Sequence, residues 1–483
     1  MRAKSLFIAT LLLSTSTLSA YAATTPDDAA KLKAVLQGYF GSAADSLKID
    51  PAGDGYKVSL DSAAISKAAQ ANGLDLTLQA LAFDLTPMGG GKWKVHNDGP
   101  FSVSAKMKDQ FDVSEKAESM VTDGVFDEAL GAFTTMTATA KNLVVKEMIV
   151  DPKATTINAD LKYDDIATTI SGAAAAAGGG VDVKIAYKIG HGDLVEDISS
   201  AGEQPLHLVI GMDGGTADAT LTSFKSLAML QLFKFLSAHT TKEQLGKDQA
   251  AFKTLLTDLL PGFGTMDAKA SLGKTTVQTP LGTFGIDKVG VTLAANGALK
   301  EGKFSEGMSL EGLTLPPSLV PAWASSLVAN HTSVTFALSG FDLESAAKAA
   351  IAAADFTKDP PISEAAGNAL TEVLLPKGIA TVALSNTVIS NNTYKITVDG
   401  TVDAGPTAKP TGKAHVTAKG LDDIMKAIQA APPEMGMQGG AAVIVVAKGM
   451  GKAGSDGTIS WDVEATPDGK INVNGIDVSQ MAK

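Results

Sequence analysis

The chain has 483 residues, of which 45% are hydrophobic and 5% aromatic, and it carries a formal net charge of −12. Acidic and basic residues are interspersed without a lysine- or arginine-rich block, which argues against nucleic acid or an anionic lipid surface as the main partner, since both bind clustered positive charge. Cysteine is absent, which excludes disulfides and the acylated cysteine of a lipoprotein.

The first 22 residues have the three parts of a secretory signal peptide. Arg2 and Lys4 provide the positive charge, Leu6–Leu13 is an apolar stretch too short to span a bilayer, and Ala20-Tyr21-Ala22 is a small-x-small cleavage site. We therefore predict cleavage after Ala22 and a periplasmic location. No later apolar run reaches the ~18 residues of a membrane helix, so the mature chain is expected to be soluble and to lack a transmembrane segment.

The mature chain is predicted to open with a helix, because Thr25 is a good N-cap and Pro26 a good first helical residue. Strands with period-2 alternation follow at Tyr56–Leu60, Lys92–His96 and Phe101–Ala105. Asp98-Gly99-Pro100 separates the last two and is expected to form a hairpin turn.

Alternating segments predict many further strands. They are Thr155–Leu161, Val181–Ile189, Leu206–Met212, Ala217–Leu221, Thr275–Thr279, Val289–Leu293, Thr332–Leu338, Ile379–Ser385, Tyr394–Val398, Lys413–Ala418, Ala441–Val446, Thr458–Val463 and Lys470–Ile476. Thr466-Pro467-Asp468-Gly469 has the composition of a tight hairpin turn between the last two.

Helical periodicity predicts a helix over Phe224–Leu236 and another from Leu245 to Leu260, which Pro261-Gly262 ends. Composition marks Ser171–Gly180 and Pro432–Gly440 as linkers. A break near residue 265 divides the mature chain into two β-rich α+β domains, residues 23–265 and 266–483.

A weak internal repeat connects strand to helix in the same way at two places. Ser339-Gly340-Phe341-Asp342 and Lys419-Gly420-Leu421-Asp422 each follow a strand and precede a helix. In each copy Gly is expected to end the strand, the bulky apolar residue to anchor the turn, and Asp to cap the helix. Asp61, between Tyr56–Leu60 and a helix over Ser62–Asn72, is a degenerate third copy.

Catalytic and metal-binding motifs are weak throughout. Ser345 and Lys348 match the S-x-x-K spacing of penicillin-interacting serine enzymes, but no S-D-N or K-T-G follows. The six histidines are scattered, Asp160, Asp164 and Asp165 lack a calcium-loop pattern, and Met435 and Met437 form a poor copper(I) pair. We therefore predict no enzymatic activity, no cofactor and no metal.

Apolar side chains of the two central helices suggest a ligand groove, although plain core packing explains the same pattern. The residues assigned to this groove are Phe224, Leu230, Phe233, Leu255 and Leu259.

The Gly-Phe/Leu-Asp turns and the closing segment Asp468–Gly475 resemble exported proteobacterial proteins of the AsmA-like and YdgA-like kind. The resemblance implies an extended, twisted antiparallel sheet with helices on one face and a role in envelope maintenance or lipid handling. It assigns no functional residue, and the chain differs from many such proteins in having a cleavable signal in place of a membrane anchor.

These observations predict an α+β protein built from repeated β-plus-helix modules, with an extended antiparallel sheet and amphipathic helices packed on one face. The expected function is that of a soluble periplasmic, non-enzymatic binding or structural protein of the cell envelope. Its expected partners are an apolar ligand such as a lipid and an envelope protein. The alternative is an exported hydrolase of unknown class.

Overall fold

The computed structural model describes residues 24–479 except 72, 80–81, 152–154, 177 and 201. Among the described residues, strands make up 51% and helices 24%, and the strands pair antiparallel, which agrees in part with the predicted β-rich α+β fold. The predicted signal peptide lies outside the described residues. None of the described helices combines the length and apolarity needed to cross a membrane.

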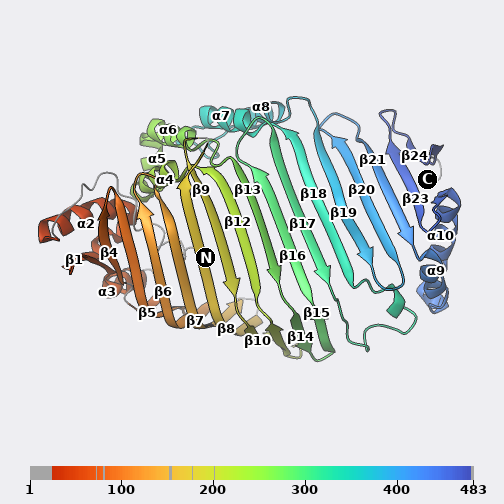
Figure 1. The fold of residues 1–483 in the computed structure, drawn as a ribbon, viewed down its shortest axis with the longest axis horizontal. Coiled ribbons are helices and arrows are strands. Elements are labelled where there is room, and N and C mark those ends of the chain that lie inside the picture. The colour runs from red at the N-terminus through yellow and green to blue at the C-terminus, as the bar shows by residue number, and fades with distance from the viewer. Residues whose placement is uncertain are drawn as a thin grey trace. The chain divides into compact units, whose positions relative to one another are not determined.

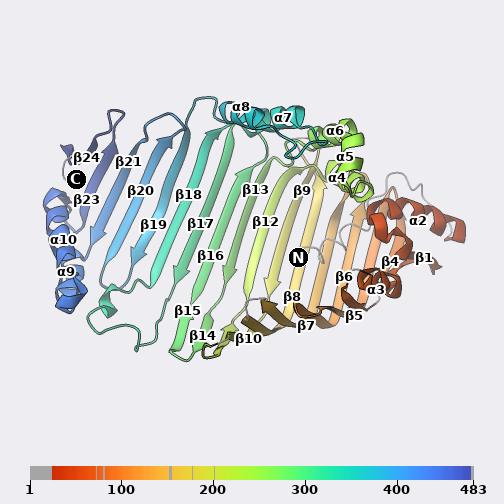
Figure 2. The ribbon, with the colours of Figure 1, turned by 180° about the vertical axis from the view of Figure 1, so that it is seen from behind.

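The chain forms two compact units that we describe separately (Figures 1 and 2). Unit 1 comprises residues 1–266 and 347–367, and unit 2 comprises residues 267–346 and 368–483. The sequence boundaries between the units fall within β13 (Thr265–Leu272), α7 (Leu343–Ala353) and α8 (Glu364–Leu374).

Unit 1 is a twisted antiparallel sheet with helices near its first strands. Its strands are β1 (Leu47–Ala52), β2 (Gly55–Leu60), β3 (Asp75–Leu78), β4 (Ala82–Gly89), β5 (Lys92–Met107), β6 (Phe111–Asp127), β7 (Ala132–Asp151), β8 (Thr155–Ala174), β9 (Val181–Ile189), β10 (Gly192–Ser200), β11 (Leu206–Met212) and β12 (Gly215–Phe224). Its helices are α2 (Pro26–Phe40), α3 (Ser62–Gln70), α4 (Ser226–Ala238), α5 (Lys242–Lys247) and α6 (Gln249–Leu259), with a 3-10 turn η1 (Gly41–Ser46).

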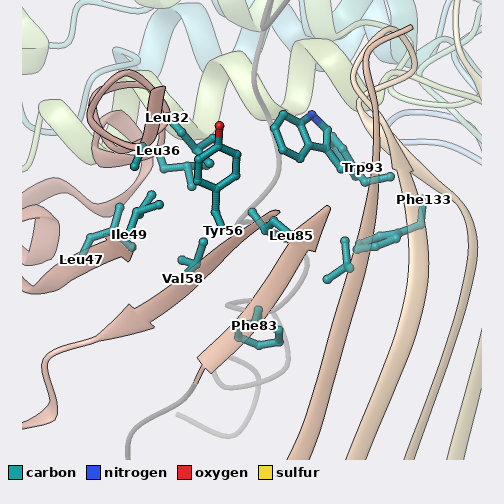
Figure 3. Packing of buried hydrophobic residues seen from close by; sticks show 13 residues of the cluster. Leu32, Leu36, Leu47, Ile49, Tyr56, Val58, Phe83, Leu85, Trp93 and Phe133 are labelled. Atoms are coloured by element: carbon teal, nitrogen blue, oxygen red, sulfur yellow. The ribbon is translucent and has the colours of Figure 1, made fainter. Parts of the chain in front are cut away.

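Helix α2 covers the first strands of unit 1 and closes its core (Figure 3). The helix begins as predicted, because the Thr25 hydroxyl accepts a hydrogen bond from the Asp28 amide at 3.2 Å. Its Leu36 is fully buried and belongs to one cluster with side chains of β1, β2, β4 and β5, among them Tyr56 and Leu85. Trp93 joins this core, and its Nε1 donates to a Glu128 carboxylate oxygen at 2.7 Å.

Unit 2 is a second antiparallel sheet, with helices packed against its last strands. Its strands are β14 (Thr275–Thr279), β15 (Gly282–Ile286), β16 (Lys288–Asn296), β17 (Gly302–Glu311), β18 (His331–Phe341), β19 (Ala380–Ser390), β20 (Lys395–Ala404), β21 (Thr411–Lys419), β22 (Lys452–Ala453), β23 (Ile459–Ala465), β24 (Ile471–Val473) and β25 (Ile476–Asp477). Its helices are α9 (Leu421–Gln429) and α10 (Gln438–Met450), with the 3-10 turns η2 (Ser325–Leu327) and η3 (Pro433–Met435).

The two copies of the Gly-apolar-Asp turn both connect a strand to the helix that follows it, β18 to α7 and β21 to α9. Gly420 follows the end of β21 as predicted, whereas Gly340 still lies within β18, which ends at Phe341. Both glycines have positive φ, 86° and 80°. The caps differ: Asp342 accepts from the Ser345 amide at 2.8 Å, whereas Gly420 itself is the N-cap of α9. The third predicted copy has the expected cap, since Asp61 accepts from the Ala64 amide at 3.1 Å.

Alanine at these two glycines is expected to destabilise the protein unequally. Gly340→Ala should lower the free energy of unfolding by roughly 1–2 kcal/mol, because its positive φ is strained for a residue with a Cβ while the nearest atom to that Cβ lies at 3.6 Å. Gly420→Ala should cost about 3 kcal/mol or more, because its Cβ would meet the Thr393 carbonyl oxygen at 2.2 Å. Urea denaturation measures both, and equal losses would contradict the predicted backbone clash.

Four local predictions are wrong. Asp98-Gly99-Pro100 is no hairpin turn but lies within β5, where a register shift between Gly99 and Phe101 accommodates a proline that cannot donate to the ladder. Ser171–Gly180 is not a linker, because it contains the end of β8 and a tight connection to β9. In this connection the Ala175 amide donates a hydrogen bond to the Gly180 carbonyl oxygen at 3.0 Å. Ala441–Val446 is not a strand but part of helix α10. Pro432–Gly440 is not a linker, because it contains η3 and the beginning of α10.

Candidate functional site

The sheet of unit 2 has one apolar and one polar face, because successive side chains of a strand point to opposite sides. The β-ladder places Phe304, Leu338, Val382 and Val402 directly opposite one another on β17, β18, β19 and β20. With strands about 4.8 Å apart, this row crosses roughly 14 Å of sheet. We call the side of the sheet that carries this row the apolar face of unit 2.

Much of this face is open to solvent. The four residues of the row are between 37% and 45% exposed, and Met308 and Phe336 on the same face are 54% and 51% exposed. Neither view shows a helix of unit 2 over β17–β20 (Figures 1 and 2). Monomeric proteins rarely leave contiguous apolar patches of this kind uncovered, so the face is a candidate interaction site.

Helix α10 contacts the same face at one of the last strands of unit 2. Trp461 of β23 is buried, and its Nε1 donates to the Ala447 carbonyl of α10 at 2.8 Å. Ala418 of β21 is buried, and so is Ile428 of α9, whose side chain lies close to Gly440 of α10. The contrast with β17–β20 shows that exposure of the apolar row is a local feature and not a property of the whole face.

The opposite, polar face of unit 2 carries cross-strand ion pairs. Lys413 and Glu464 are directly opposite on β21 and β23, with Nζ 3.1 Å from the carboxylate. His415 and Asp462 are also directly opposite and form a hydrogen bond, with Nδ1 2.8 Å from Oδ1. The pKa of Asp462 is lowered by a hydrogen bond from Lys452 and by the His415 contact. Each exposed pair of this kind contributes little stability.

Unit 1 repeats the same division between faces. Its apolar face includes the row Phe111–Ile149–Ile157–Ile198–Leu206, which crosses β6, β7, β8, β10 and β11. Ile149 and Leu206 are exposed, while the other three are half-buried. The polar face again holds pairs of opposite residues, such as Lys106 with Asp112 at 2.9 Å and His207 with Asp197 at 2.7 Å.

A few glutamates interrupt the apolar faces. Glu115, Glu147 and Glu196 lie on the apolar face of unit 1, and Glu306 lies on that of unit 2. Burial raises the pKa of Glu115, which stands opposite Val103 and Val145. A desolvated carboxylate is costly unless a partner compensates it, so these residues are unusual features of an otherwise apolar surface.

Two open surface cavities of about 390 and 280 Å³ lie on unit 1. The larger is lined mainly by polar-face residues, including Asp112, Lys146, Asp160 and Asp197. The smaller includes Lys94 and Asp123 and is also mainly on the polar face. Neither cavity is lined by a residue of the predicted groove.

The five predicted groove residues are distributed over β12, α4 and α6. Phe224 stands opposite Val181 in the β-ladder, Leu230 packs on the turn at Gly131, and all five are half-buried. Helices α4 and α6 do pack together, through the stacked rings of Phe235 and Phe252, whose centroids are 5.7 Å apart. A groove formed by Phe224, Leu230, Phe233, Leu255 and Leu259 remains a prediction.

Several residues of the weak catalytic and metal-binding motifs form hydrogen bonds within the fold. The Ser345 hydroxyl donates to Asp342 at 2.8 Å and so takes part in capping α7. His96, His207 and His415 pair with aspartates across neighbouring strands. Within the described part of the chain, no group of three or more histidine, aspartate and glutamate side chains is arranged to hold a metal ion.

The exposed apolar row was missed from the sequence although its signal was present. Residues 303–310 alternate strictly between Lys303, Ser305, Gly307 and Ser309 on one side and Phe304, Glu306, Met308 and Leu310 on the other. This alternation predicts strand β17 and an apolar face. It does not tell whether another element covers that face.

Comparison with known proteins returned no match: no protein-family model, no curated protein and no solved structure is significantly similar to the chain.

Proposed function

We propose that the chain is an exported, non-enzymatic binding protein of the periplasm whose open apolar sheet faces take up an apolar ligand, such as a lipid acyl chain. The observation that carries this proposal is the row Phe304–Leu338–Val382–Val402, in which every member remains more than one-third exposed. The resemblance to AsmA-like and YdgA-like envelope proteins also favours lipid handling.

The energetics favour a long chain over a small ligand. Burying a methylene is worth roughly 0.8 kcal/mol, and about half of that when the chain lies on an open face and buries one side. A chain that follows the row across four strands gains this contribution at many carbons and also covers the side chains beneath it. A polar solute of similar size gains little from such a surface.

In this proposal, the helices predicted on one face cover only part of each sheet and leave the remainder for the ligand. Helix α2 packs on the first strands of unit 1, and α10 packs on Trp461 near the end of unit 2. The strands β17–β20 would then be the open part of unit 2, and β7–β11 the open part of unit 1.

Native mass spectrometry of protein purified from its own periplasm tests the proposal. We expect a chain beginning at Ala23 that carries an additional apolar mass, and organic extraction should release the same molecule. Mock fractions from cells that lack the protein are the control. Recovery of ligand-free protein that also fails to bind the neutral amphiphile dodecyl maltoside would contradict the proposal.

A further inference from the structure

The charges on the two apolar faces are all of one sign. Among the described strand residues, the apolar faces of β5–β12 and β16–β23 carry glutamates but no lysine, arginine or histidine. The basic residues of these strands lie on the polar faces, where Lys106, Lys413 and His415 are examples. A ligand that lies on these strands therefore meets carboxylates of the strands and no cationic side chain of theirs.

The glutamates also differ from polar-face acids in what stands opposite them. Asp112 and Glu464 each face a lysine across the strands and form an ion pair with it, and Asp197 forms a hydrogen bond with the opposite His207. Glu196 instead stands opposite Ala159 and Leu208, and Glu306 opposite Leu293 and Phe336. The residues directly opposite Glu196 and Glu306 therefore carry no positive charge.

A ligand that covers these carboxylates must compensate them. An acyl chain alone would strip water from Glu115, Glu196 or Glu306, which costs free energy when no partner replaces the water. A cationic head group supplies that partner as a charge-assisted hydrogen bond or ion pair. A phosphate, sulfate or carboxylate head group would add repulsion between like charges.

We propose that the apolar faces of the two units select amphiphiles whose head group is a cation, such as a long-chain amine or quaternary ammonium compound. The proposal rests on the proposed function, because it takes the apolar faces as the binding surface. It adds the chemical class of the ligand: an apolar chain that lies on the rows and a positive group that lies against Glu115, Glu196 or Glu306.

Three probes with the same dodecyl chain test this selectivity on the full mature chain. We would titrate dodecyltrimethylammonium, dodecyl maltoside and dodecyl sulfate by calorimetry, below their micellar concentrations and at physiological salt, where long-range attraction to the net negative protein is screened. The ammonium probe should bind roughly tenfold more tightly than the maltoside, and the sulfate more weakly than either.

A triple variant distinguishes the effect of the apolar-face glutamates from the effect of the protein's net charge. Its substitutions are Glu115→Gln, Glu196→Gln and Glu306→Gln, and its control, with the same change in net charge, carries Glu203→Gln, Glu311→Gln and Glu464→Gln. The first variant should lose the roughly tenfold preference for the ammonium probe and keep its affinity for the maltoside, while the control keeps both.

The possible failures are distinguishable. Equal binding of the three probes, tighter binding of the sulfate, or an equal loss in both variants would overturn the selectivity while leaving the proposed function intact. Failure of all three probes to bind would overturn the proposed function itself. Circular dichroism of each variant establishes that it is folded.

Discussion

Leu36→Ala is expected to lower the free energy of unfolding by about 3 kcal/mol, within the 2–5 kcal/mol range typical of buried leucines. Leu36 is fully buried in α2 and belongs to the cluster that joins this helix to β1, β2 and β4. Truncation removes its burial and leaves a cavity that the rigid sheet beneath cannot fill. Urea denaturation followed by far-ultraviolet circular dichroism measures the loss.

Leu236→Ala provides the matched control in the same unit. Leu236 lies in α4 and is 40% exposed, so its truncation should cost less than about 1 kcal/mol. Similar losses for the two variants would mean that α2 does not close the core of unit 1.

Local signals in the sequence predict much of the strand content. Val181–Ile189 and Leu206–Met212 coincide with β9 and β11, because strict alternation sets both the strand and its two faces. The Gly340 and Gly420 turns were also predictable, because a left-handed residue between strand and helix requires glycine. These features depend on neighbours close in sequence.

Features that depend on distant partners were not predictable. Val443 and Val446 favour a strand by propensity, yet they lie in α10, which packs on Trp461 and Ile428. The extra length of β5 depends on its pairing with β6, which carries the strand past Pro100.

The exposure of the candidate site also depends on residues distant in sequence. The alternation around Phe304 predicts an apolar face, and such faces are normally expected to be buried. That β17–β20 remain uncovered depends on where the helices of unit 2 pack, and the helices α9 and α10 pack toward β21 and β23. The sequence therefore led to a predicted ligand groove on helices, whereas our proposal places the ligand on the sheet.

Phe336→Asp should weaken the binding of dodecyl maltoside by about 30-fold, equivalent to ~2 kcal/mol, while changing the melting temperature little. Phe336 is 51% exposed on the apolar face of unit 2, between Glu306 of β17 and Leu384 of β19. The substitution removes apolar contact area and places a second carboxylate beneath the bound chain, where it loses water. The ring is already half in solvent, so its removal costs little packing, and repulsion between the new carboxylate and the opposite Glu306 should lower the melting temperature only slightly.

The adjacent residue supplies the control for this last prediction. Ala337 follows Phe336 in β18 but faces the polar side, opposite Ser305 and Ala383. Ala337→Asp introduces the same charge one residue away, on the other side of the sheet. The affinity for dodecyl maltoside should stay within about twofold of wild type, because charges on the far side of a sheet are screened from the ligand. Calorimetric titration with dodecyl maltoside compares the affinities of the two variants, and their melting temperatures are measured in parallel. If the two aspartates weaken binding equally, the ligand does not lie on the apolar face, and the row through Phe304 and Leu338 has another role.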